Sequence, residues 1–218
     1  MTEGGPRLRG RGFRPGGRWV APVDEPGTRR LFFAVPIPEE ARARIGDLIG
    51  SVQASVGDGN ARIRWVRVDG LHLTLRFLGP TPDALQAPLE AAADAIARAQ
   101  APFEVALGGG GAFPSLQQPR SLWIGVTSGA DRLAAIADGL TDAASECGLA
   151  LDTRRFTPHL TIARTDGLRL GPTAAGALEQ AAEGLDVRFT VGEVVLFRSI
   201  LGHGPARYEP LHEARLGG

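Results

Sequence analysis

The chain contains no lysine, since all 24 of its basic residues are arginine. Without a lysine amine, the protein cannot form a Schiff base or a covalent lysine–nucleotide intermediate. This excludes an ATP-dependent ligase of the adenylylating type. The use of arginine in place of lysine is typical of a GC-rich coding sequence. The chemical exclusion holds whatever the cause of this bias.

Cysteine and long apolar segments are also scarce. Cys147 is the only cysteine, so the chain cannot form an internal disulfide, and we expect this side chain to act as a small buried hydrophobe. No apolar run approaches the roughly 18 residues of a membrane helix, and the N-terminal region lacks the apolar stretch of a secretory signal. We therefore expect a cytoplasmic protein with no membrane contact.

The overall composition is that of a globular protein with no net charge. The chain has 218 residues, 43% of them hydrophobic, and its formal net charge at pH 7 is zero. This length is sufficient for one well-cored unit or for two small lobes. Neutrality argues against a long footprint on duplex nucleic acid, but it permits binding of a short end.

The first 27 residues are rich in Gly, Pro and Arg and have no sustained apolar period, so we predict a flexible tail ahead of a folded domain over 28–218. Five arginines would allow this tail to touch nucleic acid, although a dispensable tail is the interpretation we favour. These residues are Arg7, Arg9, Arg11, Arg14 and Arg18.

Hydrophobic periodicity predicts short strands alternating with amphipathic helices. The predicted strands cover 31–35, 62–68, 103–107, 121–126, 187–199 and a segment around Tyr208, with helices at 39–56, 81–100, 130–147 and 173–183. We expect Asp69-Gly70 to turn the second strand into a hairpin, and residues 108–111 to form a glycine-rich loop. The mixed order predicts an α+β fold with mainly antiparallel sheets.

One phrase occurs twice in the chain. Residues 72–79 read HLTLRFLG, and residues 159–164 read HLTIAR, 87 positions later. Each follows a predicted helix and strand, which suggests an ancient duplication into two pseudo-symmetric lobes. Two of only four histidines lie in this phrase, whereas His203 and His212 stand in no repeated context and are predicted to be surface or loop residues.

Strand alternation places the polar groups of each phrase on one face. In the first copy His72 and Thr74 lie opposite the leucines, and in the second His159 and Thr161 do the same. The hydrogen-bonding groups of a single histidine of this kind are more often satisfied by a neighbouring residue on a sheet surface. The repetition of both groups instead favours a cleft that the two strands share.

Two imidazoles suit a two-step proton transfer, because one can be neutral and accept a proton while the other is charged and donates one. The threonine hydroxyls can donate hydrogen bonds to a phosphoryl oxygen. Metal binding is the alternative use of two histidines. It usually needs a third His, Cys or carboxylate nearby, and neither phrase supplies one.

The repeated phrase resembles the tandem His-x-Thr-x pattern of the 2H phosphoesterases. The surrounding segments are similar to the RNA 2′,3′-cyclic phosphodiesterases, also called 2′-5′ RNA ligases, over about residues 30–216. They read RLFFAVPIPEE, RWVRVDGLHLTLRFLG, GAFPS, RFTPHLTIAR and LFRSILGHGPARYEPL. The resemblance implies two lobes, each a mainly antiparallel sheet flanked by helices, around a central groove. It also implies hydrolysis of a cyclic phosphate to a 2′-phosphate without a metal or other cofactor.

The resemblance also implies a role for each motif residue. His72 would be the proton donor to the leaving ribose oxygen, and His159 the proton acceptor that activates water. Thr74, Thr161 and Arg164 would bind the substrate phosphate. Phe77 would contact the nucleotide. Strict alternation puts Phe77 and Arg164 on the apolar faces, so both roles need the strand to bulge or end before them.

Two other functions remain open at this stage. The same residues could join RNA ends through a 2′-5′ linkage, or the protein could be a non-catalytic module that binds RNA ends. The intact histidines argue against binding alone, which would favour arginine. The expected partners are RNA ends or small nucleotides with a 2′,3′-cyclic phosphate, bound by a monomer. Trp65, Phe33, Phe156 and Tyr208 are predicted to be core residues rather than base-stacking ones.

Removing the tail tests the predicted domain boundary. A chain that starts at Gly27 should keep its melting temperature and its turnover of small substrates, because the tail has no apolar pattern to pack. Binding to longer RNA at low salt should weaken slightly through loss of the arginines. A large fall in melting temperature would show that the tail is structural.

Overall fold

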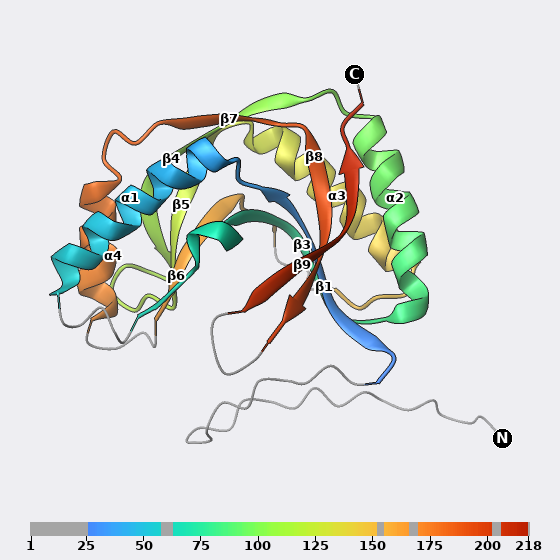
Figure 1. Ribbon diagram of the computed structural model, residues 1–218, viewed down its shortest axis with the longest axis horizontal. Coiled ribbons are helices and arrows are strands. Elements are labelled where there is room, and N and C mark those ends of the chain that lie inside the picture. The colour runs from blue at the N-terminus through green and yellow to red at the C-terminus, as the bar shows by residue number, and fades with distance from the viewer. Residues whose placement is uncertain (1–25, 58–62, 152–154, 166–169, 202–205, 218) are drawn as a thin grey trace.

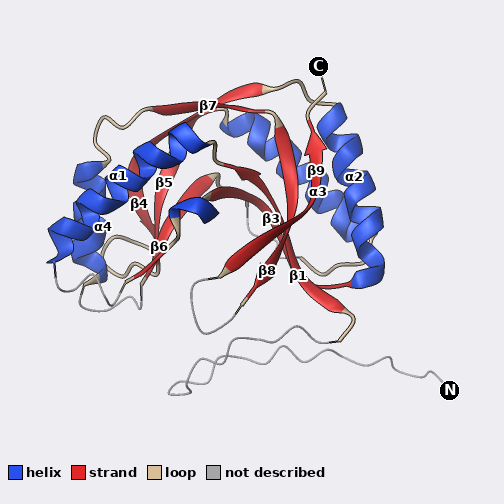
Figure 2. Ribbon diagram, viewed as in Figure 1, coloured by secondary structure: helices blue, strands red, loops and turns tan. Residues whose placement is uncertain are grey.

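The fold is described from a computed structural model that places residues 26–57, 63–151, 155–165, 170–201 and 206–217. The tail predicted over 1–27 lies outside these residues up to residue 25. Helices and antiparallel strands alternate in the mixed order expected for an α+β fold (Figures 1 and 2). The predicted fold class is thereby confirmed.

The helices and strands have the following bounds. The α-helices are α1 (Glu39–Val56), α2 (Gln86–Arg98), α3 (Ala130–Glu146) and α4 (Gly171–Ala181). The strands are β1 (Thr28–Pro36), β2 (Arg64–Trp65), β3 (His72–Pro82), β4 (Phe103–Phe113), β5 (Ser121–Ser128), β6 (His159–Arg164), β7 (Val187–Val191), β8 (Glu193–Ile200) and β9 (Arg207–Arg215). Short 3-10 helices cover Val68–Gly70 and Asp83–Leu85.

The strands form two antiparallel sheets, and each sheet contains one copy of the repeated phrase. The first, sheet A, has four strands in the order β3-β1-β8-β9, and the second, sheet B, has five in the order β2-β6-β5-β4-β7. The first histidine motif begins β3, and the second begins β6. Because β3 and β6 contact each other, the two motif strands lie where the sheets meet.

Each sheet is covered in part by a helix that follows a strand of the other sheet. The helix α1 follows β1 of sheet A but packs on β7 of sheet B and on α4, and α3 follows β5 of sheet B but packs on β3 of sheet A and on α2 (Figure 1). The strands β7 and β8 are separated only by Gly192 and belong to different sheets. The chain therefore interlaces the two halves.

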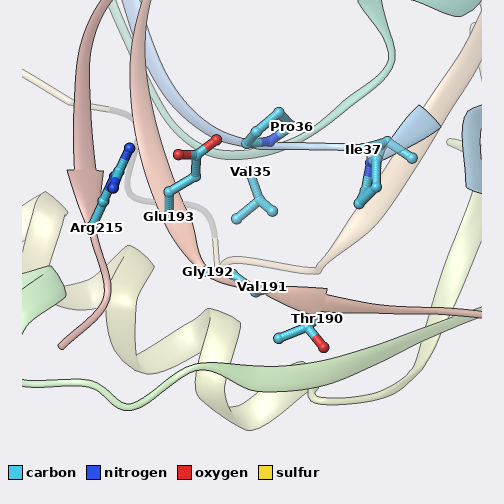
Figure 3. A pocket seen from close by; sticks show the side chains of 9 residues that line it. Val35, Pro36, Ile37, Thr190, Val191, Gly192, Glu193 and Arg215 are labelled. Atoms are coloured by element: carbon cyan, nitrogen blue, oxygen red, sulfur yellow. The ribbon is translucent and has the colours of Figure 1, made fainter. Parts of the chain in front are cut away.

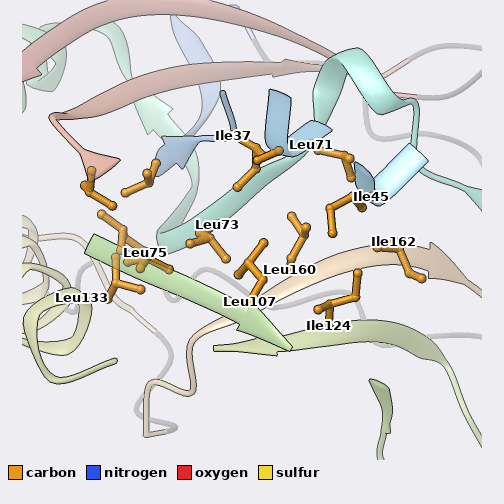
Figure 4. Close-up of a cluster of buried hydrophobic side chains, with 14 of the residues drawn as sticks. Ile37, Ile45, Leu71, Leu73, Leu75, Leu107, Ile124, Leu133, Leu160 and Ile162 are labelled. Atoms are coloured by element: carbon orange, nitrogen blue, oxygen red, sulfur yellow. The ribbon is translucent and has the colours of Figure 1, made fainter. Parts of the chain in front are cut away.

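A single hydrophobic core joins both halves. Leucines 73 and 75 of β3 and Leu160 and Ile162 of β6 are at most 2% exposed, and they belong to one continuous cluster with residues of α1, β4 and β5 (Figure 4). Side chains at alternate strand positions enter this core, which leaves the histidines and threonines on the opposite face. Burial of the apolar positions therefore fixes the direction of the polar ones.

The hairpin expected around Asp69-Gly70 is wrong. In the described part of the alternating segment, residues 63–68, only Arg64 and Trp65 form a strand, and this strand pairs with β6 of sheet B rather than with β3. Residues 68–70 form a 3-10 helix between the two sheets. The alternation of arginine and apolar residues correctly predicted a strand, but the strand that pairs with it lies almost a hundred residues away in the sequence.

Three other predicted boundaries also change. The helix predicted over 81–100 starts later: Thr81 is buried in β3, where its hydroxyl donates to the Gly79 carbonyl at 3.1 Å, and α2 starts at Gln86. The predicted glycine-rich loop is the middle of β4. The long strand predicted over 187–199 divides at Gly192 into β7 and β8.

The glycines of β4 create space for neighbouring groups. A Cβ atom on Gly111 would lie 2.3 Å from the Trp123 ring, and one on Gly108 would lie 2.5 Å from the Leu185 carbonyl oxygen. A side chain at either position would displace a ring or the backbone. The glycine run therefore reflects close packing on a strand rather than a turn.

Core truncation in either half should destabilise the whole molecule. Leu73→Ala in β3 and Leu160→Ala in β6 should each lower the free energy of unfolding by about 2–5 kcal/mol, because each side chain is fully buried in the shared core. Val68→Ala, at a side chain that is 38% exposed, is the control and should change it by less than about 0.5 kcal/mol. Denaturant titration should show one transition in each case, and two separate transitions would contradict a shared core.

Candidate active site

The two motif strands present their polar groups as strand alternation predicts. His72 and Thr74 are partly buried while the leucines after them are buried, and His159 and Thr161 show the same alternation in β6. We call the side of each sheet that carries these groups the motif face. It lies opposite the hydrophobic core.

A β-bulge follows the threonine in both strands, at the same place. In β3, Thr74 pairs with Ala34 and Arg76 pairs with Phe33, so Leu75 is the extra residue. In β6, the extra residue is Ile162. Each is the third residue after its histidine, and a bulge at this point reverses the faces of the residues that follow.

The bulges bring Phe77 and Arg164 to the motif face. Phe77 pairs with Phe32, whose ring lies against His72, and Arg164 pairs with Ser121 on the motif face of β5. Both are the fifth residue after their histidine, so they occupy equivalent positions in the two halves. One half therefore supplies an aromatic ring where the other supplies a guanidinium group.

Both imidazoles are oriented by a main-chain carbonyl two residues earlier. His72 Nδ1 lies 2.8 Å from the Gly70 oxygen, and His159 Nδ1 lies 2.7 Å from the Thr157 oxygen. A carbonyl oxygen can only accept, so Nδ1 carries the hydrogen and donates it in both residues. The neutral ring then has its basic lone pair on Nε2, which is the atom left for a substrate.

Aromatic rings surround the two histidines to different degrees. His72 is enclosed by three rings, those of Phe32 at 4.9 Å, Tyr208 at 4.8 Å and Phe197 at 6.2 Å between centroids. His159 has Phe113 at 5.1 Å and, farther away, Trp123. The ring of His72 therefore lies in the more apolar environment.

Burial lowers the pKa of His72 below its ordinary value, and the positive charge of Arg164 adds to this shift, whereas the hydrogen bond to Gly70 opposes it. The pKa of His159 is lowered by the same three effects, with Thr157 in place of Gly70. Burial also raises the pKa of Tyr208, and Arg164 opposes that change. The Arg164 charge therefore acts on groups in both halves of the molecule.

The remaining polar groups on the motif face have no partner of their own. Within the described part of the chain, neither the Thr74 hydroxyl nor the Thr161 hydroxyl forms a hydrogen bond, and Arg164 forms no ion pair. Arg64 of β2 lies opposite Arg164 of β6 in the strand register, so the residue next to Arg164 on the neighbouring strand is also cationic. Unpaired hydroxyls and guanidinium groups beside two imidazoles are suited to an oxyanion with several oxygens.

The sequence interpretation missed most of the aromatic residues around the histidines. Tyr208 was expected in the core but is half-buried against the His72 ring, and Phe32, Phe197, Phe113 and Trp123 were given no role. The neighbouring GAFPS segment was the available signal for Phe113. Their positions depend on pairing between distant strands, which a single sequence does not reveal.

The other predicted aromatic residues have core positions. Phe33 is 1% exposed, and Trp65 and Phe156 are partly buried against the core, as expected.

Phe77 is 48% exposed, and the Arg30 guanidinium lies 5.2 Å from its ring centroid. Phe77 is therefore available to a ligand on one side and supported by a cation on the other.

The structure describes one of the other two histidines. His203 lies outside the described residues. His212 is not a loop residue, because it belongs to β9 and its Nε2 atom lies 2.9 Å from the Asp94 carboxylate of α2. This contact fastens α2 to sheet A. Cys147, expected to be buried, is partly exposed at the end of α3.

An open pocket of about 410 Å³ lies where the end of β1 meets the junction of β7 and β8 (Figure 3). None of the predicted site residues lines it, although Pro36 in its wall pairs with His72. Its charged groups are Glu193 and Arg215, which lie opposite each other in the register of β8 and β9. Burial, and then the nearby Glu213, raises the pKa of Glu193, while Arg215 opposes this.

The described residues include neither a metal-binding cluster nor a membrane-spanning helix. No group of three or more His, Cys, Asp or Glu side chains is arranged to hold a metal ion. No described helix is both long enough and apolar enough to cross a membrane.

The two interlaced sheets each present a histidine and a threonine on the motif face, with Arg164 at the end of β6. The chain belongs to the 2′-5′ RNA ligase superfamily, whose family model matches residues 37–202. The resemblance found in the sequence is thereby confirmed.

Two curated relatives are named RNA 2′,3′-cyclic phosphodiesterase. The protein of Geobacillus stearothermophilus is 35% identical over 182 residues, which cover 83% of this chain but only 55% of the relative. The protein of Escherichia coli strain K12 is 30% identical over 183 residues, covering 84% of this chain and 94% of the relative. This chain therefore spans about half of the first relative and nearly all of the second.

The fold is also similar to a solved structure. The crystal structure of Escherichia coli LigT complexed with 3′-AMP matches with a TM-score of 0.68 and 29% sequence identity. The match covers 87% of this chain and 98% of LigT.

Removing the Arg164 charge should change both the rate and its pH dependence. Arg164→Gln should lower kcat about 10²–10³-fold, as loss of one preorganised group at a developing anion does. Because Arg164 lowers the pKa of both histidines, its removal raises both values and should move the pH profile of kcat/KM to higher pH. Arg44→Gln, at an exposed arginine of α1, is the matched control, and a profile that stays fixed in Arg164→Gln would contradict the placement of this charge.

Proposed function

We propose that this protein hydrolyses RNA 2′,3′-cyclic phosphate ends to 2′-phosphate ends by acid and base catalysis from two histidines. The observation that carries the proposal is the matched pair His72 and His159. Both have Nδ1 fixed on a carbonyl and Nε2 free, and the unpaired Arg164 acts on both. The relatives' name and the superfamily supply the substrate class.

His159 acts as the proton acceptor in this mechanism. Its Nε2 atom takes a proton from water as the water oxygen attacks phosphorus. The P–O3′ bond breaks on the opposite side of phosphorus, and O3′ receives a proton from Nε2 of His72, the proton donor. Division of the two roles between facing strands suits an in-line displacement, in which the entering and leaving oxygens lie on opposite sides.

The aromatic surroundings of His72 are compatible with its role as acid. Burial favours its neutral form in the free protein, but the face of a neighbouring ring such as Phe32 attracts a cation. Bound phosphate adds a negative charge, which raises the pKa of both histidines. The protonated form of His72 is therefore favoured when substrate is present.

Thr74, Thr161 and Arg164 hold the non-bridging phosphate oxygens in this proposal. The hydroxyls donate hydrogen bonds, and the guanidinium offsets charge that develops as the new P–O bond forms. Phe77 contacts the nucleotide through its exposed ring face. None of these groups requires a metal or another cofactor.

We further propose that the active unit is a cytoplasmic monomer that consists of residues 28–218. All four motif residues and Arg164 come from one chain, and one hydrophobic core supports both motif strands. The site is therefore complete without a second copy.

One assay tests the function directly. An oligonucleotide ending in a 2′,3′-cyclic phosphate is incubated with the full chain, with and without EDTA, and the products are separated against 2′-phosphate and 3′-phosphate standards. The expected product is the 2′-phosphate alone, at the same rate in EDTA. A mixture of isomers would contradict the fixed division of roles, and loss of activity that a divalent metal restores would contradict the metal-independent mechanism.

The two histidines should behave as one catalytic unit. His72→Ala and His159→Ala should each lower kcat by about 10²–10⁴-fold, as expected when a general acid or base is removed. The double variant should be little worse than either single one, because groups that act as a unit are not additive. His212→Asn is the control: it removes a histidine outside the site and should keep its turnover. Substantial activity in both single variants would contradict the assignment.

A further inference from the structure

The arginine that lies over the Phe77 ring has no anionic partner. The Arg30 guanidinium is 5.2 Å from the Phe77 ring centroid, and its Nε atom is buried without a hydrogen-bond partner. Within the described part of the chain, Arg30 forms no ion pair. A partly buried guanidinium that lacks a counter-charge is stabilised by an anion that reaches it.

Two neighbouring arginines of sheet A, by contrast, have acidic partners. Arg29, on the opposite face of β1, lies 3.0 Å from the Asp83 carboxylate. Arg198 of β8 lies 3.8 Å from the Glu209 carboxylate. Both of these ion pairs lie away from the motif face, so the charge of Arg30 is the one that stays uncompensated beside the site.

The strand register places Arg30 beyond the residue that contacts the nucleotide. Three alternate residues of β1 lie opposite Thr74, Phe77 and Pro80, and they are, in this order, Ala34, Phe32 and Arg30. Each step between them is two residues, which is about 7 Å along a strand. The motif face of sheet A therefore presents a phosphate-binding hydroxyl, then an aromatic ring, then a cation.

Sheet B has no equivalent cation. Its strand β5 places Ser121 opposite Arg164, as β1 places Phe32 opposite Phe77. The residue two positions before Ser121 is Pro119, which is buried and carries no charge. The line of polar, aromatic and cationic groups therefore continues past the site on the sheet A side.

An RNA end has its groups in the same order. In the proposed function, the cyclic phosphate lies at Thr74 and the terminal nucleoside contacts Phe77. The 5′-oxygen of that nucleoside is on the other side of the ribose from its 2′- and 3′-oxygens, so the rest of the chain leaves in the direction away from Thr74. The first upstream phosphodiester then comes to the level of Arg30.

We infer that Arg30 binds the phosphodiester immediately 5′ of the terminal nucleoside, so that the site selects the end of an RNA chain over a free cyclic mononucleotide. This inference rests on the proposed function, which supplies the position of the cyclic phosphate. A guanidinium can donate to two phosphate oxygens at once, and the diester charge compensates its own. Arg30 thereby determines specificity through a part of the substrate that does not react.

Three substrates test the inference on the unmodified protein. They are a dinucleotide that ends in a 2′,3′-cyclic phosphate, the same dinucleotide with an uncharged methylphosphonate linkage, and the matching cyclic mononucleotide. The full chain should hydrolyse the charged dinucleotide with a kcat/KM roughly tenfold above that of the other two, as one hydrogen bond between charged groups provides. Equal kcat/KM values for the charged and uncharged dinucleotides would overturn the inference.

Salt dependence gives a second measure of the same contact. A plot of log kcat/KM against log salt concentration should be steeper for the charged dinucleotide than for the uncharged one by about 0.7, the slope of one phosphate contact on a single strand. The same slope for both dinucleotides would also contradict the contact.

Variants of the two adjacent arginines assign the preference to Arg30. In Arg30→Gln the ratio of kcat/KM for the charged to the uncharged dinucleotide should fall to about one. Arg30 also supports the Phe77 ring, but a change in that ring affects both dinucleotides and cancels in the ratio. Arg30→Lys, which keeps the charge, should retain part of the preference, and Arg29→Gln is the matched control that should retain all of it. A wild-type ratio in Arg30→Gln would overturn the inference.

The outcomes also separate this inference from the proposed function. If the wild-type protein hydrolyses all three substrates with equal kcat/KM, the upstream contact is refuted and the hydrolase remains. If it hydrolyses none of them, the proposed function itself has failed.

Discussion

The site depends on the burial of alternate side chains from two strands in one core. Leu73 and Leu75 from β3 and Leu160 and Ile162 from β6 are fully enclosed, so neither strand can slip by one residue without exposing its apolar side chains. The same constraint directs both histidines and both threonines to the motif face. Since β3 and β6 contact each other across two interlaced sheets, the core also determines that the two motifs meet.

A limited departure from alternation gives the site its chemical asymmetry. The bulges at Leu75 and Ile162 occur at the same step of the two motifs and bring the fifth residue after each histidine to the motif face. That residue is aromatic in one half and cationic in the other. The two halves share the same backbone geometry, and different side chains at equivalent positions give them different chemical properties.

The sequence predicted what depends on local periodicity and on the repeated motif. The fold class, most helices and the faces of His72 and His159 followed from these patterns. The roles of Phe77 and Arg164 also required each strand to bulge or end before them, although no sequence feature distinguished the two possibilities or located the bulge. The predictions of a hairpin at residues 69–70 and a loop at 108–111 were wrong because both depend on contacts with residues distant in sequence. A strand partner distant in sequence decided the first, and the shape of the Trp123 ring decided the second.

The carbonyl partners of the two imidazoles have a consequence for the catalytic cycle. A carboxylate in that position would hold one ring as the cation, but the oxygens of Gly70 and Thr157 are neutral and equivalent. In the proposed mechanism each turnover therefore leaves His159 charged and His72 neutral, an isomer of the starting protein poised for the reverse reaction. Exchange of protons with solvent must interconvert these two isomers before the next forward cycle. Buffer concentration thus becomes a kinetic variable for this site.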